Sequence, residues 1–174
     1  MIFDCLGRLF EEVPDSWLKD TATPASNNIF EGNRPSMPLL STEAKIFYHR
    51  TMQLLYLCKC VWPDVQLPIV YLTTRVQNPT CADYKKLQKT VKYLYMNRHL
   101  PRTRESKNLS VIKCYIDALF AVRDNIRSHT GGIMTMNKGC VYGASLRQRL
   151  NNKSSTEARI VWVSDLLPQI VWTR

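Results

Sequence analysis

The sequence predicts an α+β protein in which a helical N-terminal part precedes an antiparallel sheet and one more helix. Apolar residues recur at steps of three and four between about residues 41 and 95, the spacing of amphipathic helices. Beyond about residue 108 the pattern changes to short apolar runs separated by turn residues, which is typical of strands. With 45% apolar residues among 174, the chain can build a hydrophobic core. We therefore expect a helical region at 1–108 and a sheet-containing region at 109–174.

The helical region is expected to begin with a short helix at 1–18 and an exposed linker at about 19–40. The apolar spacing then predicts a helix that is capped by Ser41 or Thr42 and ends near Cys60. A second helical pattern covers about 64–75 and contains Pro68. That proline removes one backbone donor and costs about 3 kcal/mol unless the helix starts late.

A third helix is predicted from Cys81 to about Tyr95, with Thr80 as its cap. Its apolar residues should face inward, while a row of lysines stays in water: Lys85, Lys86, Lys89 and Lys92. This row could bind phosphates, or it could be the solvated face of an ordinary amphipathic helix.

Three antiparallel strands are predicted in the second region, at 111–122, 132–136 and 140–146. The turns between them are expected at 128–132 and 137–139, where polar residues and glycine gather. Residues 153–156 should cap a final helix that runs from Glu157 toward Trp172. Pro168 is expected to interrupt or end that helix.

The charge balance favours a polyanionic partner. Lysine and arginine number 24 against 14 acidic residues, a net charge of +10. Nucleic acid and an anionic membrane surface both fit this charge. The chain shows no apolar run of the roughly 20 residues that span a membrane, and its start lacks a secretory signal. We expect a soluble intracellular protein that does not enter a membrane, in the cytoplasm or the nucleus.

The six cysteines are scattered, and only Cys58 and Cys60 are close in sequence. No second cysteine pair or histidine pair completes a zinc site. The sequence favours buried free thiols over a metal site or disulfides. The histidines His49, His99 and His129 lie far apart without a nucleophile motif, so ordinary surface or hydrogen-bonded histidines are expected, with His129 a candidate to lie near nucleic acid.

Three motifs occur in a characteristic order: an acid, Asp117, in the run 115–118, then SHTGG at 128–132, then KSSTEA at 153–158. This order resembles the start of the ribonuclease H domain in the Pol polyprotein of copia-type LTR retrotransposons. The segments PDVQ at 63–66 and DYKKL at 83–87 resemble the region between its reverse transcriptase and ribonuclease H. The resemblance implies a helical connection region at 1–108 and, at 109–174, an incomplete ribonuclease H-like three-stranded antiparallel sheet and helix. The matched part lacks the paired aspartates of the polymerase.

The resemblance implies cleavage of RNA in RNA/DNA hybrids, which uses two Mg²⁺ ions about 4 Å apart, held by carboxylates. Asp117 matches the catalytic, metal-binding acid of the first strand; alternatively it is a strand-end acid satisfied by backbone donors. Arg159 stands where the family has its helix acid, and it should repel cations and pair with Asp117. Glu157 and Asp165 lie about 200° and 120° away around a helix, so neither can replace the missing acid.

The remaining acids of the family are expected beyond Arg174, so we expect a truncated, inactive Pol fragment that does not hold Mg²⁺ functionally. Arg147, Arg149 and Lys153 could contact the backbone of an RNA/DNA hybrid or another nucleic acid, or could form a solvated basic loop. Two other functions remain open. The chain could be a non-catalytic nucleic-acid-binding protein, or a module that docks on intact Pol proteins through an apolar sheet face.

Overall fold

The computed structural model describes residues 21–26, 29–30, 36–100, 111–122, 126–136 and 138–173. Its contacts divide the chain into two compact units: unit 1 (Met1–Ile29 and Asn33–Pro101) and unit 2 (Phe30–Gly32 and Arg102–Arg174). The described residues contain four α-helices and one three-stranded antiparallel sheet, which confirms the α+β class. The helix predicted at 1–18 and the boundary predicted at 108/109 lie outside the described residues and stay predictions.

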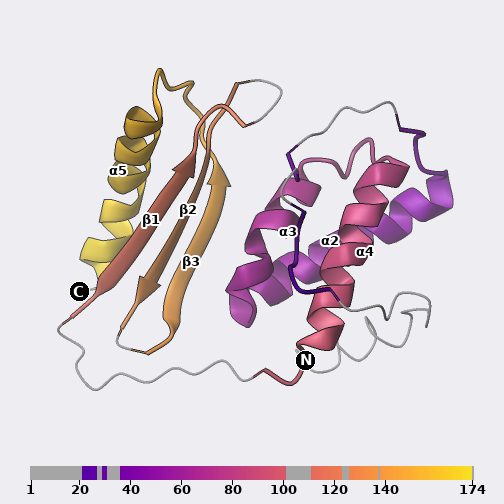
Figure 1. Ribbon diagram of the computed structural model, residues 1–174, viewed down its shortest axis with the longest axis horizontal. Coiled ribbons are helices and arrows are strands. Elements are labelled where there is room, and N and C mark those ends of the chain that lie inside the picture. The colour runs from indigo at the N-terminus through magenta and orange to yellow at the C-terminus, as the bar shows by residue number, and fades with distance from the viewer. Residues whose placement is uncertain are drawn as a thin grey trace. The chain divides into compact units, whose positions relative to one another are not determined.

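Unit 1 is built around helix α2 (Ser41–Cys60), which packs with α3 and α4 (Figure 1). The predicted face is buried, with Phe47, Thr51, Leu54, Leu57 and Cys58 in the interior. The predicted cap is wrong, because Ser41 already belongs to the helix and Leu40 holds the N-cap position. The Leu40 N–H instead donates to the Glu43 carboxylate at 3.3 Å. An acid three residues into the helix therefore replaces the missing cap side chain.

The second helical segment consists of a 3₁₀-helix η2 (Pro63–Val65) and helix α3 (Gln66–Thr73). Pro68 is the third residue of α3, where a backbone N–H would have no partner within the helix. The helix therefore meets the condition under which the proline costs little, since α3 starts only two residues before Pro68. Ile69 and Leu72 are fully buried and fix α3 against its neighbours.

Helix α4 (Cys81–Met96) begins as predicted, with Thr80 as cap. Thr80 and Asp83 exchange hydrogen bonds: the Thr80 N–H donates to Asp83 Oδ2 at 3.1 Å, and the Asp83 N–H donates to Thr80 Oγ1 at 3.4 Å. The predicted inward face is confirmed, because Leu87, Val91 and Leu94 are buried.

The segment before α2 is less exposed than predicted. Its described parts contain no helix or ladder strand, but Pro38 forms an isolated β-bridge with Thr80. The Cys81 N–H donates to the Met37 carbonyl at 2.9 Å, and Ile29 is buried. The expectation of an exposed linker is wrong for Ile29, whereas Met37 and Pro38 are exposed as predicted, although their segment is hydrogen-bonded to the start of α4.

Unit 2 contains strands β1 (Lys113–Leu119), β2 (His129–Thr135) and β3 (Cys140–Arg147) in the order β1-β2-β3. Both pairs are antiparallel, and the register aligns Ile116 with Gly132 and Gly132 with Ala144. The turn predicted at 128–132 is wrong, since β2 begins at His129. Residues 129 and 130 are buried in the sheet rather than exposed in a turn.

Helix α5 (Ser155–Thr173) lies along one face of this sheet (Figure 1). Trp162 and Leu166 pack with Ala144 and form the core of the unit. Pro168 lies inside α5, so the predicted interruption is wrong. Pro168 and Ser164, whose carbonyl loses its donor, are both exposed, and water can satisfy that carbonyl. Among the described helices, none has the length and apolar character to cross a membrane.

Candidate functional site

Asp117 lies in β1 opposite Gly131, and its side chain is 76% exposed. Its Oδ1 accepts the Ala118 N–H at 2.8 Å and lies 3.8 Å from Nη2 of Arg159. The Arg159 side chain comes from the second turn of α5 and is 61% exposed. The ion pair expected from the sequence is confirmed, and the backbone donor considered as the alternative is also present. Such an exposed pair contributes at most about 1 kcal/mol to stability.

The acids near the start of α5 do not complete a metal site. The Glu157 carboxylate accepts the Lys153 N–H at 2.6 Å, while the Glu157 N–H donates to Ser154 Oγ at 3.1 Å. Glu157 is therefore used to cap the helix, where the helix dipole favours an acid. Among the residues that the structure describes, no three His, Cys, Asp or Glu side chains gather as metal ligands. One exposed aspartate beside a guanidinium does not fit a two-Mg²⁺ centre.

The basic candidates are all exposed: Arg147 ends β3, and Arg149 and Lys153 lie on the segment that joins β3 to α5. Two buried amide side chains hold this segment in place. The Gln148 side chain donates to the Ala158 carbonyl at 2.6 Å, and the Asn152 side chain donates to Ser128 Oγ at 3.3 Å and to Gln148 Oε1. The segment is thus anchored in the interior while its cations face solvent.

His129 is buried rather than available at the surface. Its Nε2 lies 2.7 Å from Ser145 Oγ, and its ring centroid lies 5.1 Å from that of Phe30 in the same unit. The prediction of an ordinary hydrogen-bonded histidine is confirmed. A side chain enclosed in this way does not offer a nucleic acid an exposed contact.

The described cysteines, Cys58, Cys60, Cys81, Cys114 and Cys140, carry thiol groups that are not in disulfides. The predicted burial is confirmed for Cys58 and is wrong for the other four, which are half-buried or exposed. Burial raises the pKa of the Cys58 thiol to about 11, so that it stays protonated and unreactive at neutral pH.

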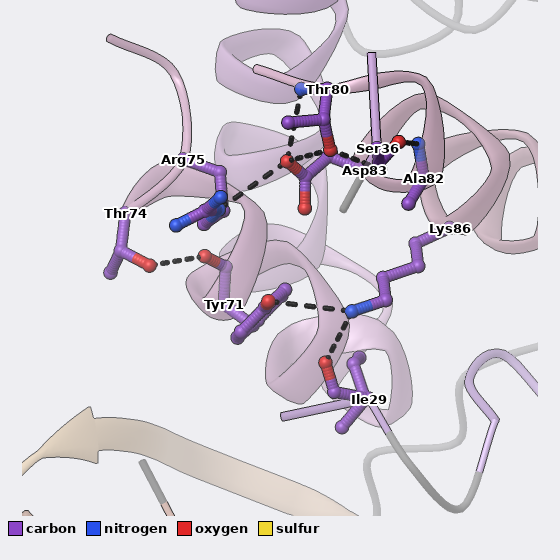
Figure 2. Close-up of polar contacts among 9 residues, drawn as sticks. All are labelled: Ile29, Ser36, Tyr71, Thr74, Arg75, Thr80, Ala82, Asp83 and Lys86. Atoms are coloured by element: carbon purple, nitrogen blue, oxygen red, sulfur yellow. Dashed lines mark hydrogen bonds and ion pairs between the residues drawn. The ribbon is translucent and has the colours of Figure 1, made fainter. Parts of the chain in front are cut away.

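The sequence pattern did not predict the structural role of Lys86. Its Nζ donates to the Ile29 carbonyl at 2.7 Å and to the Tyr71 hydroxyl at 3.3 Å (Figure 2). It also lies 4.6 Å from the centroid of the Tyr71 ring. Lys86 is therefore a structural residue that joins three segments of unit 1, unlike the other lysines of its row. Nothing in the local pattern distinguishes it, because its partners lie 57 and 15 residues away in the sequence.

Comparison with known proteins gives one informative relative. The chain is 22% identical over 171 residues to the Saccharomyces cerevisiae protein named "Putative transposon Ty5-1 protein YCL074W". The alignment covers 96% of this chain and 54% of the yeast protein, so the chain spans about half the length of this relative. This chain is similar to a transposon protein. No protein-family model matches it, and no solved structure gives a significant match.

Proposed function

We propose that this chain is a retrotransposon-derived protein from the part of a copia-type Pol polyprotein that follows the reverse transcriptase, and that its ribonuclease H-like part does not hydrolyse RNA. The similarity to a transposon protein along nearly the whole chain supports the origin. The order of the motifs supports the assignment to the part of Pol that follows the reverse transcriptase. The motifs lie on β1, at the start of β2 and at the start of α5.

The ion pair between Arg159 and Asp117 is the main observation that supports the proposed lack of ribonuclease activity. A divalent cation about 4 Å from a guanidinium would meet a repulsion of roughly 2 kcal/mol even in bulk water, and more where water is displaced. Among the described residues, Asp117 does not belong to any group of three or more possible metal ligands that could offset this repulsion. The hybrid-cleaving chemistry needs two ions held by several carboxylates. The described residues do not supply them.

A cleavage assay tests the proposal directly. The purified chain is incubated with Mg²⁺ and an RNA/DNA hybrid labelled on the RNA strand, beside the Asp117→Asn variant. We expect no cleavage by either protein. Cleavage by the natural chain that disappears in Asp117→Asn would contradict the proposal.

A second variant tests the physical reason. Arg159→Glu replaces the cation by a carboxylate at the same position of α5. We expect Mn²⁺ to broaden the amide NMR signals around Asp117 at lower concentration in Arg159→Glu than in the natural chain. Arg159→Gln is the matched control, since it removes the charge without adding a ligand. Equal broadening in all three proteins would show that Arg159 does not govern cation access.

A second candidate function is non-catalytic binding of nucleic acid through unit 2. The exposed Arg147 at the end of β3 and the anchored segment that exposes Arg149 and Lys153 favour it. Replacing these three residues by glutamine should make the affinity for an RNA/DNA hybrid less dependent on salt, because fewer counterions are released on binding. An unchanged salt dependence would remove these residues from the interface.

A further inference from the structure

A groove runs along α4 in unit 1. Lys85, Lys89 and Lys92 follow each other at steps of four and three residues, which places them on one face of the helix. Two adjoining cavities, of about 220 and 620 Å³, lie between these lysines and residues 21–26 with Ile29. Both are lined by Lys85 and Lys89, so we treat them as one feature, the α4 groove. It is bounded by segment 21–26 on one side and by Lys85, Lys89 and Lys92 on the other.

The far wall of the α4 groove is attached to the helix. The single proton of the Thr90 hydroxyl is shared between the Pro24 carbonyl and the Lys86 carbonyl of the same helix, both at 3.1 Å. Lys86 Nζ donates to the Ile29 carbonyl at 2.7 Å, as Figure 2 shows. Thr90 is fully buried, which protects its hydrogen bond from water. The lysines thus stand beside a second, anchored stretch of backbone. A lysine row on a simple solvated helix has no such wall.

The charge of the α4 groove is not offset by its own helix. Helix α4 contains four lysines and one aspartate, a net charge of +3. The aspartate, Asp83, is buried and pairs with Arg75 at 3.3 Å. The residues that line the two cavities in the described part of the chain include no acid and no aromatic side chain. Lysines without aromatic neighbours suit phosphates rather than stacked bases.

We propose that the α4 groove binds the phosphodiester backbone of single-stranded nucleic acid, RNA or DNA, without sequence preference. Lys85 and Lys92 are separated by about 10 Å along the helix axis. In a strand stacked as in B-DNA, with a rise of about 3.4 Å per nucleotide, that length corresponds to about three nucleotides. A walled groove of this size admits one strand, whereas a duplex could rest only on its rim. The site lies in unit 1 and does not depend on the proposal that unit 2 is an inactive nuclease remnant.

The test measures fluorescence anisotropy of labelled oligo(dT) and oligo(U) strands with the full chain over a series of salt concentrations. The groove variant combines Lys85→Gln, Lys89→Gln and Lys92→Gln. Its plot of log affinity against log salt should be less steep by about 2, because each neutralised phosphate contributes about 0.7 to the slope for single strands. At low salt its affinity should fall at least tenfold. A control variant, Lys45→Gln with Lys59→Gln and Lys113→Gln, carries the same charge change at exposed lysines outside the groove.

A third variant separates the shape of the groove from its charge. Thr90→Val removes the hydrogen bond to segment 21–26 and leaves the net charge unchanged. Its affinity should fall severalfold, and thermal unfolding would show that the protein is still folded. If Thr90→Val binds as the natural chain does, the second wall is not part of the site.

Four other outcomes would overturn the proposal. The first is an equal loss of binding in the groove and control variants, which would mean that only net charge matters. The second is the absence of binding at low salt, and the third is equal or tighter binding of a duplex. The fourth is binding to phosphatidylserine vesicles that the groove variant loses while it keeps its affinity for the strands. None of these measurements depends on nuclease activity, so their outcome does not test the function proposed for unit 2.

Discussion

Gly131 and Gly132 are neighbours in β2, but their surroundings differ. A Cβ atom on Gly132 would lie 2.7 Å from Nε1 of Trp162, whereas nothing lies within 4 Å of a Cβ on Gly131. Gly132→Ala should therefore lower the free energy of unfolding by about 1–3 kcal/mol through overpacking. Gly131→Ala should leave it unchanged or raise it slightly, because alanine loses less backbone entropy on folding. Urea unfolding followed by tryptophan fluorescence checks both, and equal effects would contradict this account.

The same contact explains why the sequence mispredicted this segment. Two glycines after polar residues are a local signal for a turn. Gly132 instead makes room for an indole that is 30 residues further along the chain, in α5. That contact exists only once helix and sheet are packed. Local pattern alone therefore predicted the existence of the strand but not its start.

Tyr93 provides a pH-dependent test at a single residue. Its hydroxyl donates to the Asp64 carboxylate at 2.7 Å, and this bond, together with burial, raises the pKa of Tyr93 to about 12. Because the folded-state pKa is raised above the ordinary value of 10.0, the stability contribution is complete below pH 10 and is lost as the pH approaches 12. Asp64→Asn should return the pKa toward 10. Tyrosinate absorbance during alkaline titration measures it, with Tyr93→Phe identifying the signal; an unchanged titration in Asp64→Asn would contradict the assignment.

At the scale of the helices, α2 and α4 begin with the same device in different surroundings. Each has an acid at its third position: Glu43 is exposed in α2, whereas Asp83 is buried in α4. The Asp83 carboxylate accepts bonds from Arg75, from the Thr80 N–H and from the Thr80 hydroxyl (Figure 2). In the described part of the chain, the Glu43 carboxylate accepts a single bond, from the Leu40 N–H.

Asp83→Ala should therefore lower the free energy of unfolding by about 2–3 kcal/mol, since it removes charge-assisted bonds and leaves partly buried donors unpaired. Glu43→Ala should cost less than about 1 kcal/mol, because water replaces its partner. Chemical unfolding of both variants, followed by circular dichroism, compares the two. Losses of the same size would mean that burial does not decide the value of these caps.

An element is predicted well from the sequence when the interactions that fix its ends join residues close to one another in the chain. The start of α4 was predicted because Thr80 and Asp83 are three residues apart. The start of α3 meets the condition set by Pro68, which restricts where a helix can begin. The continuation of α5 through Pro168 was not predicted, since it depends on which side of α5 faces solvent. The cap of α2 was also missed, because the acid side chain rather than a serine makes the bond.

On the scale of the whole molecule, the Asp117–Arg159 pair and the α4 groove also differ in how far the sequence predicts them. The pairing of Asp117 with Arg159 could be predicted because strand and helix positions were both readable from motifs. The α4 groove could not be predicted from the sequence, since its second wall comes from residues about 60 positions earlier in the chain. Net charge indicated a polyanionic partner, but only the packed structure indicates where lysines and backbone form a groove.

The division into two compact units makes a prediction about unfolding, because each unit has a core of its own. Leu94 is buried in unit 1 and Leu166 in unit 2. Either leucine-to-alanine change should cost about 2–5 kcal/mol within its own unit. Since about 1.4 kcal/mol is a factor of ten, amide hydrogen exchange should accelerate at least tenfold in α3 and α4 for Leu94→Ala, and in β2 and β3 for Leu166→Ala. Amides of the other unit should keep their protection in each case. Acceleration throughout the chain by either variant would show that the two units unfold as one.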